Sequence, residues 1–194
     1  MKRRIYIAAA VFIALIAVVI IANKPWEHSA DKLEITEDGR HQIDSYQMDI
    51  ATAVTLALDD FAQLYPSQKI EALYEYKPIH KERMLFRSLL NNHLFGTNRP
   101  MADIIQSTNE RKREIEKLVT EAQDEYDITV TEEEVTAYIE EMVDPHYFEE
   151  QEAYAAALGI GVAELNHQFD RDLYYFDVLA DKLLFARAAE GQFD

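Results

Sequence analysis

The sequence predicts an all-α protein in which an N-terminal transmembrane helix precedes a multi-helix domain. Apolar residues recur at steps of three and four over most of the chain, the spacing of one helix face. Strand-like alternation is absent beyond a short piece at 33–36, and an uninterrupted apolar run opens the chain. We therefore divide the chain into an anchor at residues 1–24, a tether at 25–42 and a helical domain at 43–190.

The apolar run extends from Ile5 to Ala22, directly after three basic residues at 2–4. The apolar region of a cleaved signal peptide is usually about 7 to 15 residues long, so this longer run favours an uncleaved anchor, with a cleaved signal peptide as the alternative. Basic residues before the run predict a cytoplasmic N-terminus. We expect a single-pass protein of the cell membrane, held in the bilayer through residues 5–22, with its domain extracytoplasmic.

The rest of the chain is strongly acidic. The 194 residues carry a net charge of −17; residues 1–30 hold four basic residues and one acidic residue, so the remaining 15 basic and 35 acidic residues give a net charge of −20. Phosphate binding needs a basic face, so nucleic acid is not an expected partner. Without cysteine, the chain forms no disulfide and carries no lipid-modified cysteine.

The domain is expected to begin with a helix that Asp44 caps and that stops before Pro66. Residues 67–77 are ambiguous between a short helix and a strand. A second helix is predicted from Ile79 to Leu94, with Gly96 as its C-terminal stop.

A third helix is predicted over about 101–126, either continuous or restarted by a Ser107 and Glu110 capping box in its polar middle. Thr131 and Glu134 form a further capping box for the next helix.

The helix that this Thr131 capping box opens is expected to end at Asp144 and Pro145. Another helix is expected to begin there and to run to Leu158. Gly159 and Ile160 have the spacing of a Schellman ending.

The longest periodic segment without Pro or Gly follows Gly161 and reaches Ala188, so we expect one long C-terminal helix. It carries two apolar stripes. One contains Val162, Leu165, Phe169, Leu173, Phe176, Ala180 and Leu183, and the nearly opposite one contains His167, Tyr174, Val178 and Phe185. One stripe serves the core, and the second faces another element or a partner. We expect the helix that Asp44 opens to cover part of this second stripe and to leave Tyr174 near an apolar groove.

No catalytic motif is recognisable, so we do not expect an enzyme. There is no cysteine nucleophile, no Gly-x-Ser-x-Gly turn and no Gly-rich phosphate loop among five glycines. Glu164 and His167 form a lone Glu-x-x-His pair, whereas a di-iron bundle needs two such pairs. We therefore predict no cofactor, no metal and no catalytic residue.

Residues 116–122 (EKLVTEA) and 126–139 (YDITVTEEEVTAYI) resemble the SurA/PrsA-like chaperone domains, in which a helix leads through an I-x-V-[ST]-x-E-E-V segment into a short acidic helix. Residues 157–160 (ALGI) and the following helix are similar to the second half of that domain, the SurA N-terminal-like domain. Gly161 departs from the family, which usually has Ser or Thr there. No strand-rich segment could hold a parvulin prolyl-isomerase domain, and only six residues follow Ala188.

The resemblance implies a membrane-anchored, extracytoplasmic, chaperone-like protein that binds unfolded or exported polypeptides without isomerase activity. The alternative is an envelope scaffold that binds one folded partner. Met and aromatic side chains suit adaptable apolar binding. The candidate peptide-binding residues are Met142, Tyr147, Phe148, Tyr154, Tyr174, Val178 and Phe185.

Overall fold

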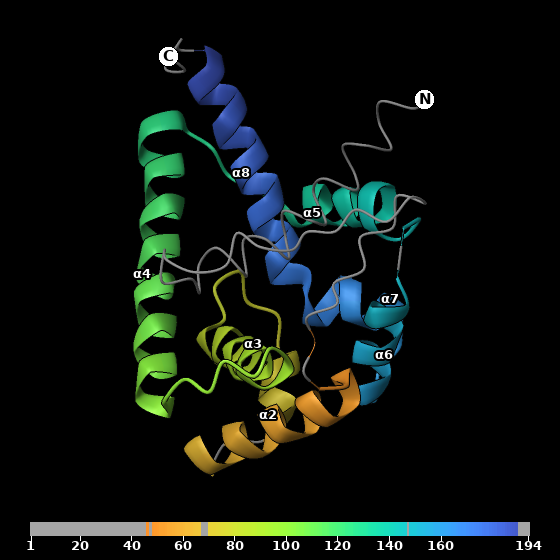
Figure 1. Ribbon diagram of the computed structural model, residues 1–194. Coiled ribbons are helices and arrows are strands. Elements are labelled where there is room, and N and C mark those ends of the chain that lie inside the picture. The colour runs from red at the N-terminus through yellow and green to blue at the C-terminus, as the bar shows by residue number, and fades with distance from the viewer. Residues whose placement is uncertain (1–45, 47, 67–69, 147, 190–194) are drawn as a thin grey trace, which may run out of the picture. The chain divides into compact units, whose positions relative to one another are not determined.

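The computed structural model describes residues 46, 48–66, 70–146 and 148–189 (Figure 1). Internal contacts separate residues 1–44 from residues 45–194, and all the described residues belong to the second unit. The predicted anchor at 1–24, the predicted tether at 25–42 and the predicted helix start up to residue 45 lie outside the described residues. Within the described ranges, no helix has the length and apolar character needed to cross a membrane.

The described part of the chain is helical and contains no strand, which confirms the all-α class. Its elements, in order, are α2 (Ile50–Leu64), η1 (Ile70–Tyr74), α3 (Lys81–Leu94), α4 (Met101–Tyr126), α5 (Glu132–Tyr138), η2 (Ile139–Val143), α6 (Glu149–Ala157), α7 (Val162–Glu164), η3 (Leu165–Phe169) and α8 (Arg171–Ala189). The short η1 is a 3-10 helix, whereas η2 and η3 are π-helical turns.

Helix α2 begins later than the sequence predicts. The carboxylate of Asp49, not that of Asp44, caps the helix by accepting from the amide of Thr52 at 3.0 Å, and Tyr46 and Met48 are not helical. The ring of Tyr46 instead packs on Phe95, with centroids 5.6 Å apart. A tertiary contact thus holds this segment outside the helix.

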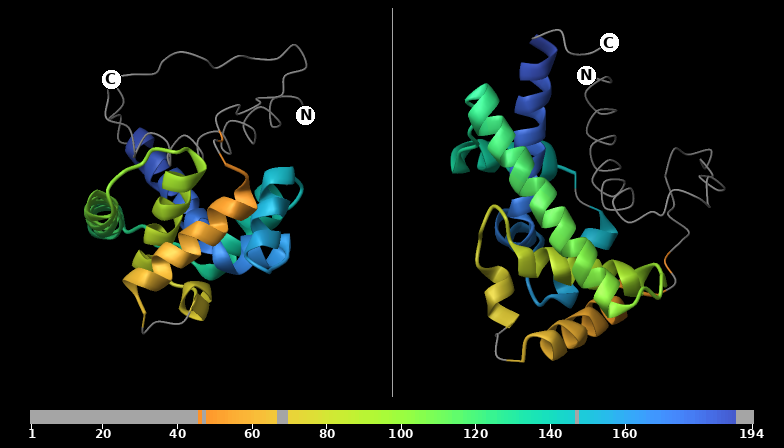
Figure 2. Two further views of the ribbon diagram at one scale, coloured as in Figure 1. Left: turned by 60° about the horizontal axis from the view of Figure 1, so that its bottom comes forward. Right: turned by 90° about the vertical axis from the view of Figure 1, so that its left-hand side faces the viewer.

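Helices α2, α3 and α6 enclose the larger of two cores, together with η1, η3 and the start of α4. Figure 2 shows α2 lying across α3. Helix α3 begins after His80, which accepts from the amide of Arg83 (3.4 Å) and lies 3.0 Å from the carbonyl of Ala72. Its fully buried residues include Leu85, Phe86 and Leu89. The predicted stop is confirmed, since Gly96 has a φ of 57°.

Helix α4 is one continuous helix of 26 residues, which rules out the restart at Ser107. The Ser107 hydroxyl donates to the carbonyl of Ile104 at 3.0 Å and accepts from Arg99 at 3.0 Å. The helix ends at Asp127, which takes a left-handed conformation (φ 53°). Beyond its middle, α4 approaches α8, and the two helices share a second, smaller core around Ala122, Leu179 and Leu183 (Figures 1 and 2).

The capping box of α5 is confirmed: Thr131 accepts from the amide of Glu134 at 3.2 Å, and Glu134 accepts from the amide of Thr131 at 2.8 Å. The predicted helix start at Pro145 is wrong, because α6 begins only at Glu149. Its ending is confirmed as a Schellman motif: the amide of Ile160 bonds to the carbonyl of Ala155 and Gly159 has a φ of 74°.

The long C-terminal helix predicted over 161–188 is divided. A single α-helical turn, α7, continues into the π-turn η3. The helical conformation is then interrupted at Asp170 (φ −99°, ψ 6°) before α8 starts. Only α8, 19 residues long, continues as a regular helix to Ala189. The prediction is wrong because Arg83 and Arg87 of α3 donate hydrogen bonds to the backbone carbonyls at this interruption.

Candidate functional site

Two arginines of α3 bind the carbonyl groups at the break between η3 and α8. Arg83 donates from Nη1 to the carbonyls of Gln168 (3.0 Å) and Phe169, and Arg87 donates from Nη2 to the carbonyl of Phe169 at 3.1 Å. The amide of Asp170 bonds to the carbonyl of Leu165 (2.7 Å), the i→i−5 bond of a π-turn. Because the arginines satisfy the freed carbonyls, the chain can leave the helix inside the core.

The same arginines bind two carboxylates that follow the break. Arg87 lies 2.8 Å from both Asp170 and Asp172, and Arg83 lies 3.1 Å from Asp172. Arg83 is 0% exposed and Asp172 2% exposed. Burial pushes the pKa of Asp172 up, but the charges of Arg87 and Arg83 outweigh burial and hold this pKa below its usual range. This network of ion pairs joins the first turn of α8 to α3 and thereby determines where α8 starts.

Two further basic residues attach α5 to α8. Arg171 donates to the carboxylate of Glu132 (2.9 Å) and to the hydroxyl of Thr136 (2.8 Å). Lys182 lies 2.6 Å from Glu134, the capping-box glutamate of α5. The short acidic helix is therefore held along one side of α8.

The sequence's Glu-x-x-His pair does not form a unit. His167 lies 2.9 Å from the carboxylate of Asp144, while Glu164 is exposed. Asn166 donates to the same carboxylate (3.0 Å) and accepts from Gln151 at 2.6 Å. Over the described ranges, no three His, Asp or Glu side chains are grouped so that they could hold a metal ion.

The second stripe of the predicted long helix is partly buried, and α5 rather than α2 covers it. Tyr174 and Val178 are buried, and the ring of Tyr174 lies 6.3 Å from that of Tyr138 in α5. The Tyr174 hydroxyl donates to Asn166 at 3.3 Å. We expected the first helix, α2, to cover this stripe and to leave a groove beside Tyr174. This expectation is wrong, because ion pairs hold α5 against this side of α8.

The remaining candidate residues lie in different places. Tyr154 packs against Phe169 in the larger core, with ring centroids 6.2 Å apart. Met142 is half-buried in η2, and Phe148, which precedes α6, is 42% exposed. Tyr147 lies outside the described residues. The candidate set thus does not form a single surface.

The most exposed large apolar side chain among the described residues is Phe185, at 74%. Its neighbour Leu184 is 52% exposed. Both follow Lys182, the residue of α8 that pairs with Glu134 of α5. Figure 1 shows that α8 extends past α5. Sequence reasoning identified Phe185 but missed Leu184, which falls in neither apolar stripe.

Two carboxylates precede Phe185 on the same helix. Asp177 and Asp181 are one turn apart, and the Oδ2 atom of Asp177 is buried with no hydrogen-bond partner among the described residues. Burial, followed by the charge of Asp181, raises the pKa of Asp177 to about 7, although the hydroxyl of Tyr138 acts in the opposite direction. Burial also raises the pKa of Asp181. Sequence reasoning missed this pair, although two acids four residues apart in an apolar helix were a visible signal.

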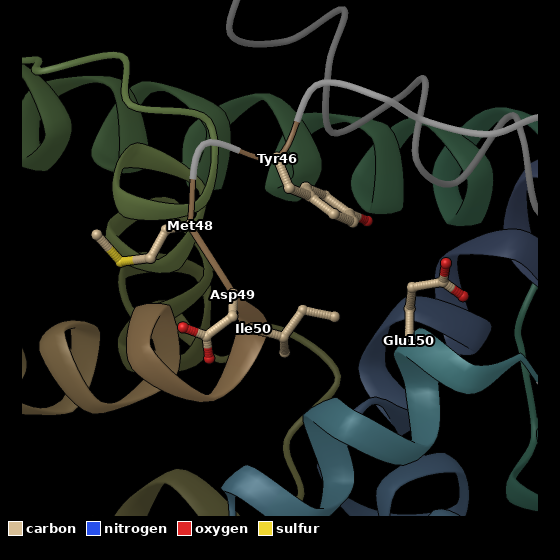
Figure 3. Close-up of a pocket in the computed structure, with 5 residues that line it drawn as sticks. All are labelled: Tyr46, Met48, Asp49, Ile50 and Glu150. Carbon is tan, nitrogen blue, oxygen red and sulfur yellow. The ribbon is translucent and has the colours of Figure 1, made fainter.

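An open pocket of about 450 Å³ lies between the start of α2 and the start of α6 (Figure 3). Its lining combines the side chains of Tyr46, Met48 and Ile50 with the carboxylates of Asp49 and Glu150. Asp49 is already engaged as the cap of α2. The pocket therefore combines the carboxylate of Glu150 with an apolar wall, and its described lining contains no grouping of acid, base and nucleophile.

No protein-family model, curated protein or solved structure matches this chain.

Proposed function

We propose that the protein is a membrane-anchored, extracytoplasmic, chaperone-like protein that binds unfolded or exported polypeptides and lacks isomerase activity. One observation carries the proposal: Leu184 and Phe185 expose apolar surface on a helix that ion pairs and a small core attach to α4 and α5. Exposed aromatic and aliphatic side chains next to one another are typical of protein-binding surfaces. The resemblance of residues 116–139 to SurA/PrsA-like domains points in the same direction.

The ion pairs of α8 bear on this proposal because they leave the exposed end of the helix anchored. Arg187 pairs with Glu121 of α4, and Lys182 pairs with Glu134 of α5. Phe185 lies between these two attachment points in sequence. A surface on a helix that is attached at two points loses less conformational freedom when a partner binds than a surface on a free helix does.

The alternative function is a scaffold that binds one folded envelope protein through the same residues. The two functions differ in selectivity. A chaperone-like surface should bind several unrelated unfolded chains, whereas a scaffold should bind one partner in a fixed ratio.

Aggregation assays with the full chain in lipid nanodiscs test the proposal. We expect it to delay the aggregation of two or three unrelated, chemically unfolded proteins and to leave the isomerisation rate of an X-Pro peptide unchanged. The double variant Leu184→Ser, Phe185→Ser should lose the delay, whereas Ala156→Ser, which alters an exposed apolar residue of α6, should retain it. Aggregation at the same rate with and without the wild-type protein would contradict the proposal.

A further inference from the structure

We propose that Asp177, Asp181 and Phe185 form one recognition strip on α8, which binds client segments where a Lys or Arg side chain neighbours a large apolar residue. The inference rests on the proposed function and specifies the class of client.

The three residues share one side of α8 because they are spaced four apart. Tyr138 of α5 faces the lower part of this side, as its ring contact with Tyr174 and its effect on the pKa of Asp177 indicate. Exposure increases along the strip: Asp177 is half-buried, Asp181 is exposed and Phe185 is the most exposed. The strip therefore leads from a sheltered carboxylate to an open aromatic ring.

The basic residues of α8 are all committed elsewhere. Arg171 pairs with Glu132, Lys182 with Glu134, and Arg187 with Glu121. In the part of the chain that the structure describes, no cation pairs with Asp177 or Asp181.

Such an arrangement costs stability in the protein alone. A half-buried carboxylate with a like charge one turn away is unfavourable unless a cation or a proton neutralises it. The hydroxyl of Tyr138 offsets only part of this cost, because it bonds to the Asp177 carboxylate without adding a positive charge. An ammonium or guanidinium group of a client that binds the exposed Asp181 carboxylate would supply that charge one helical turn from Asp177.

The apolar end of the strip limits the client further. A cation bound at Asp181 is one helical turn from Phe185, so a residue next to that Lys or Arg in the client reaches the Phe185 ring and Leu184. A Lys or Arg stem can cover the ring itself while its head contacts the carboxylate. Acidic segments are disfavoured by both carboxylates and by the net charge of −17.

Binding should depend on pH because a protonated carboxyl group attracts a cation less. The titratable groups that act on Asp177 are Asp181 of the same helix and Tyr138 of α5; Tyr174 lies near it and is affected by its charge. Both tyrosines have a raised pKa and stay neutral around pH 7. With the pKa of Asp177 raised to about 7, affinity for a cationic segment should increase between pH 6 and pH 8.

Fluorescence anisotropy with labelled peptides and the full chain in nanodiscs tests the strip. The probes are a peptide that repeats Lys next to Leu or Phe, the same peptide with norleucine in place of Lys, and the same peptide with Glu in place of Lys. We expect the Lys peptide to bind at least about tenfold more tightly than the norleucine peptide at pH 8, and the Glu peptide to bind most weakly.

The variants Asp177→Asn and Asp181→Asn should each weaken binding of the Lys peptide at least about fivefold and leave the norleucine peptide unchanged. Asp59→Asn, which removes an exposed carboxylate of α2, is the matched control and should change neither. Equal affinities for the Lys and norleucine peptides would overturn the proposed recognition strip. The proposed function would still stand if the protein delays the aggregation of its clients. Unchanged Lys-peptide affinity in both variants would also overturn the recognition strip. Loss of the aggregation delay itself would instead contradict the proposed function.

Discussion

Arg87 of α3 lies 2.8 Å from Asp172 of α8, although 85 residues separate them in sequence. Both side chains also take part in a network with Arg83 and Asp170. The network closes the larger core over the ring of Phe169, with the guanidinium groups of Arg83 and Arg87 5.6 and 5.9 Å from its centroid. It thereby determines where the helix that carries the exposed Phe185 begins.

Removing a carboxylate from this network should destabilise the protein strongly. Asp172→Asn leaves the buried Arg83 and the largely buried Arg87 with one charge partner, so we expect a loss of about 3–5 kcal/mol in the free energy of unfolding, measured by urea denaturation. Lys112→Gln, which breaks a surface pair with Glu116, is the control and should cost less than about 0.5 kcal/mol. A loss for Asp172→Asn as small as that of the control would show that the network does not hold the break.

Replacing Asp177 should stabilise the protein at alkaline pH. Its pKa rises from 3.8 to about 7 on folding, so the folded state binds more protons than the unfolded state in this interval, and stability falls as pH rises from about 4 to 7. Asp177→Asn removes this penalty, which amounts to up to about 4 kcal/mol above pH 7 and vanishes below pH 4. Urea denaturation at pH 4 and pH 8 measures it. An equal effect of the substitution at both pH values would contradict the assigned pKa.

The exposed aromatic of α8 should contribute little to stability. Phe185→Ala should change the free energy of unfolding by less than about 0.5 kcal/mol. Phe86→Ala, in the larger core, should cost about 3–5 kcal/mol, and Phe176→Ala, half-buried against α4, should fall between the two. The same denaturant titrations measure all three. A large loss for Phe185→Ala would assign this ring to the core and remove the main support for a binding surface.

The Schellman ending of α6 should depend on its glycine. Gly159 has a φ of 74°, where a side chain is strained, so Gly159→Ala should cost about 1 kcal/mol although no atom lies within 4 Å of the added methyl group. Gly161→Ala is the control: its φ is −84° and its surroundings are equally open, so its stability should stay within about 0.5 kcal/mol of the wild type. Thermal melts distinguish the two. Identical shifts would mean that the turn can adopt another conformation.

The anchor prediction is tested by topology. A reporter that is active only outside the cytoplasm, fused after Asp194, should be active, and the mass of the mature protein should include residues 1–24. A soluble product that lacks the first 22 to 30 residues would refute the anchor but not the export. An inactive reporter would refute the export itself.

Several local features follow directly from the sequence. The Thr131 and Glu134 capping box, the stop at Gly96 and the Schellman ending at Gly159 all appear in the structure as predicted. Each involves residues within about five positions of one another, so the interactions that define it exist in almost any fold. The all-α class follows for the same reason, because helical periodicity is a local property.

The features that shape the candidate binding surface involve distant residues. The helix break at Asp170 depends on Arg83 and Arg87, and the periodicity of the segment, which continues across the break, conceals it. The covering of Tyr174 depends on how Arg171 and Lys182 bind α5.

The sequence by itself therefore determined the fold class, the acidic charge and the helix endings at Gly96 and Gly159, and it left open whether Phe185 is buried or exposed. Only the tertiary structure decided that Asp177 lies half-buried with no cation partner among the described residues, and that Leu184 joins Phe185 at the surface. The physical reason is that caps and periodicity act between neighbours in sequence, whereas burial and ion pairing act between neighbours in space.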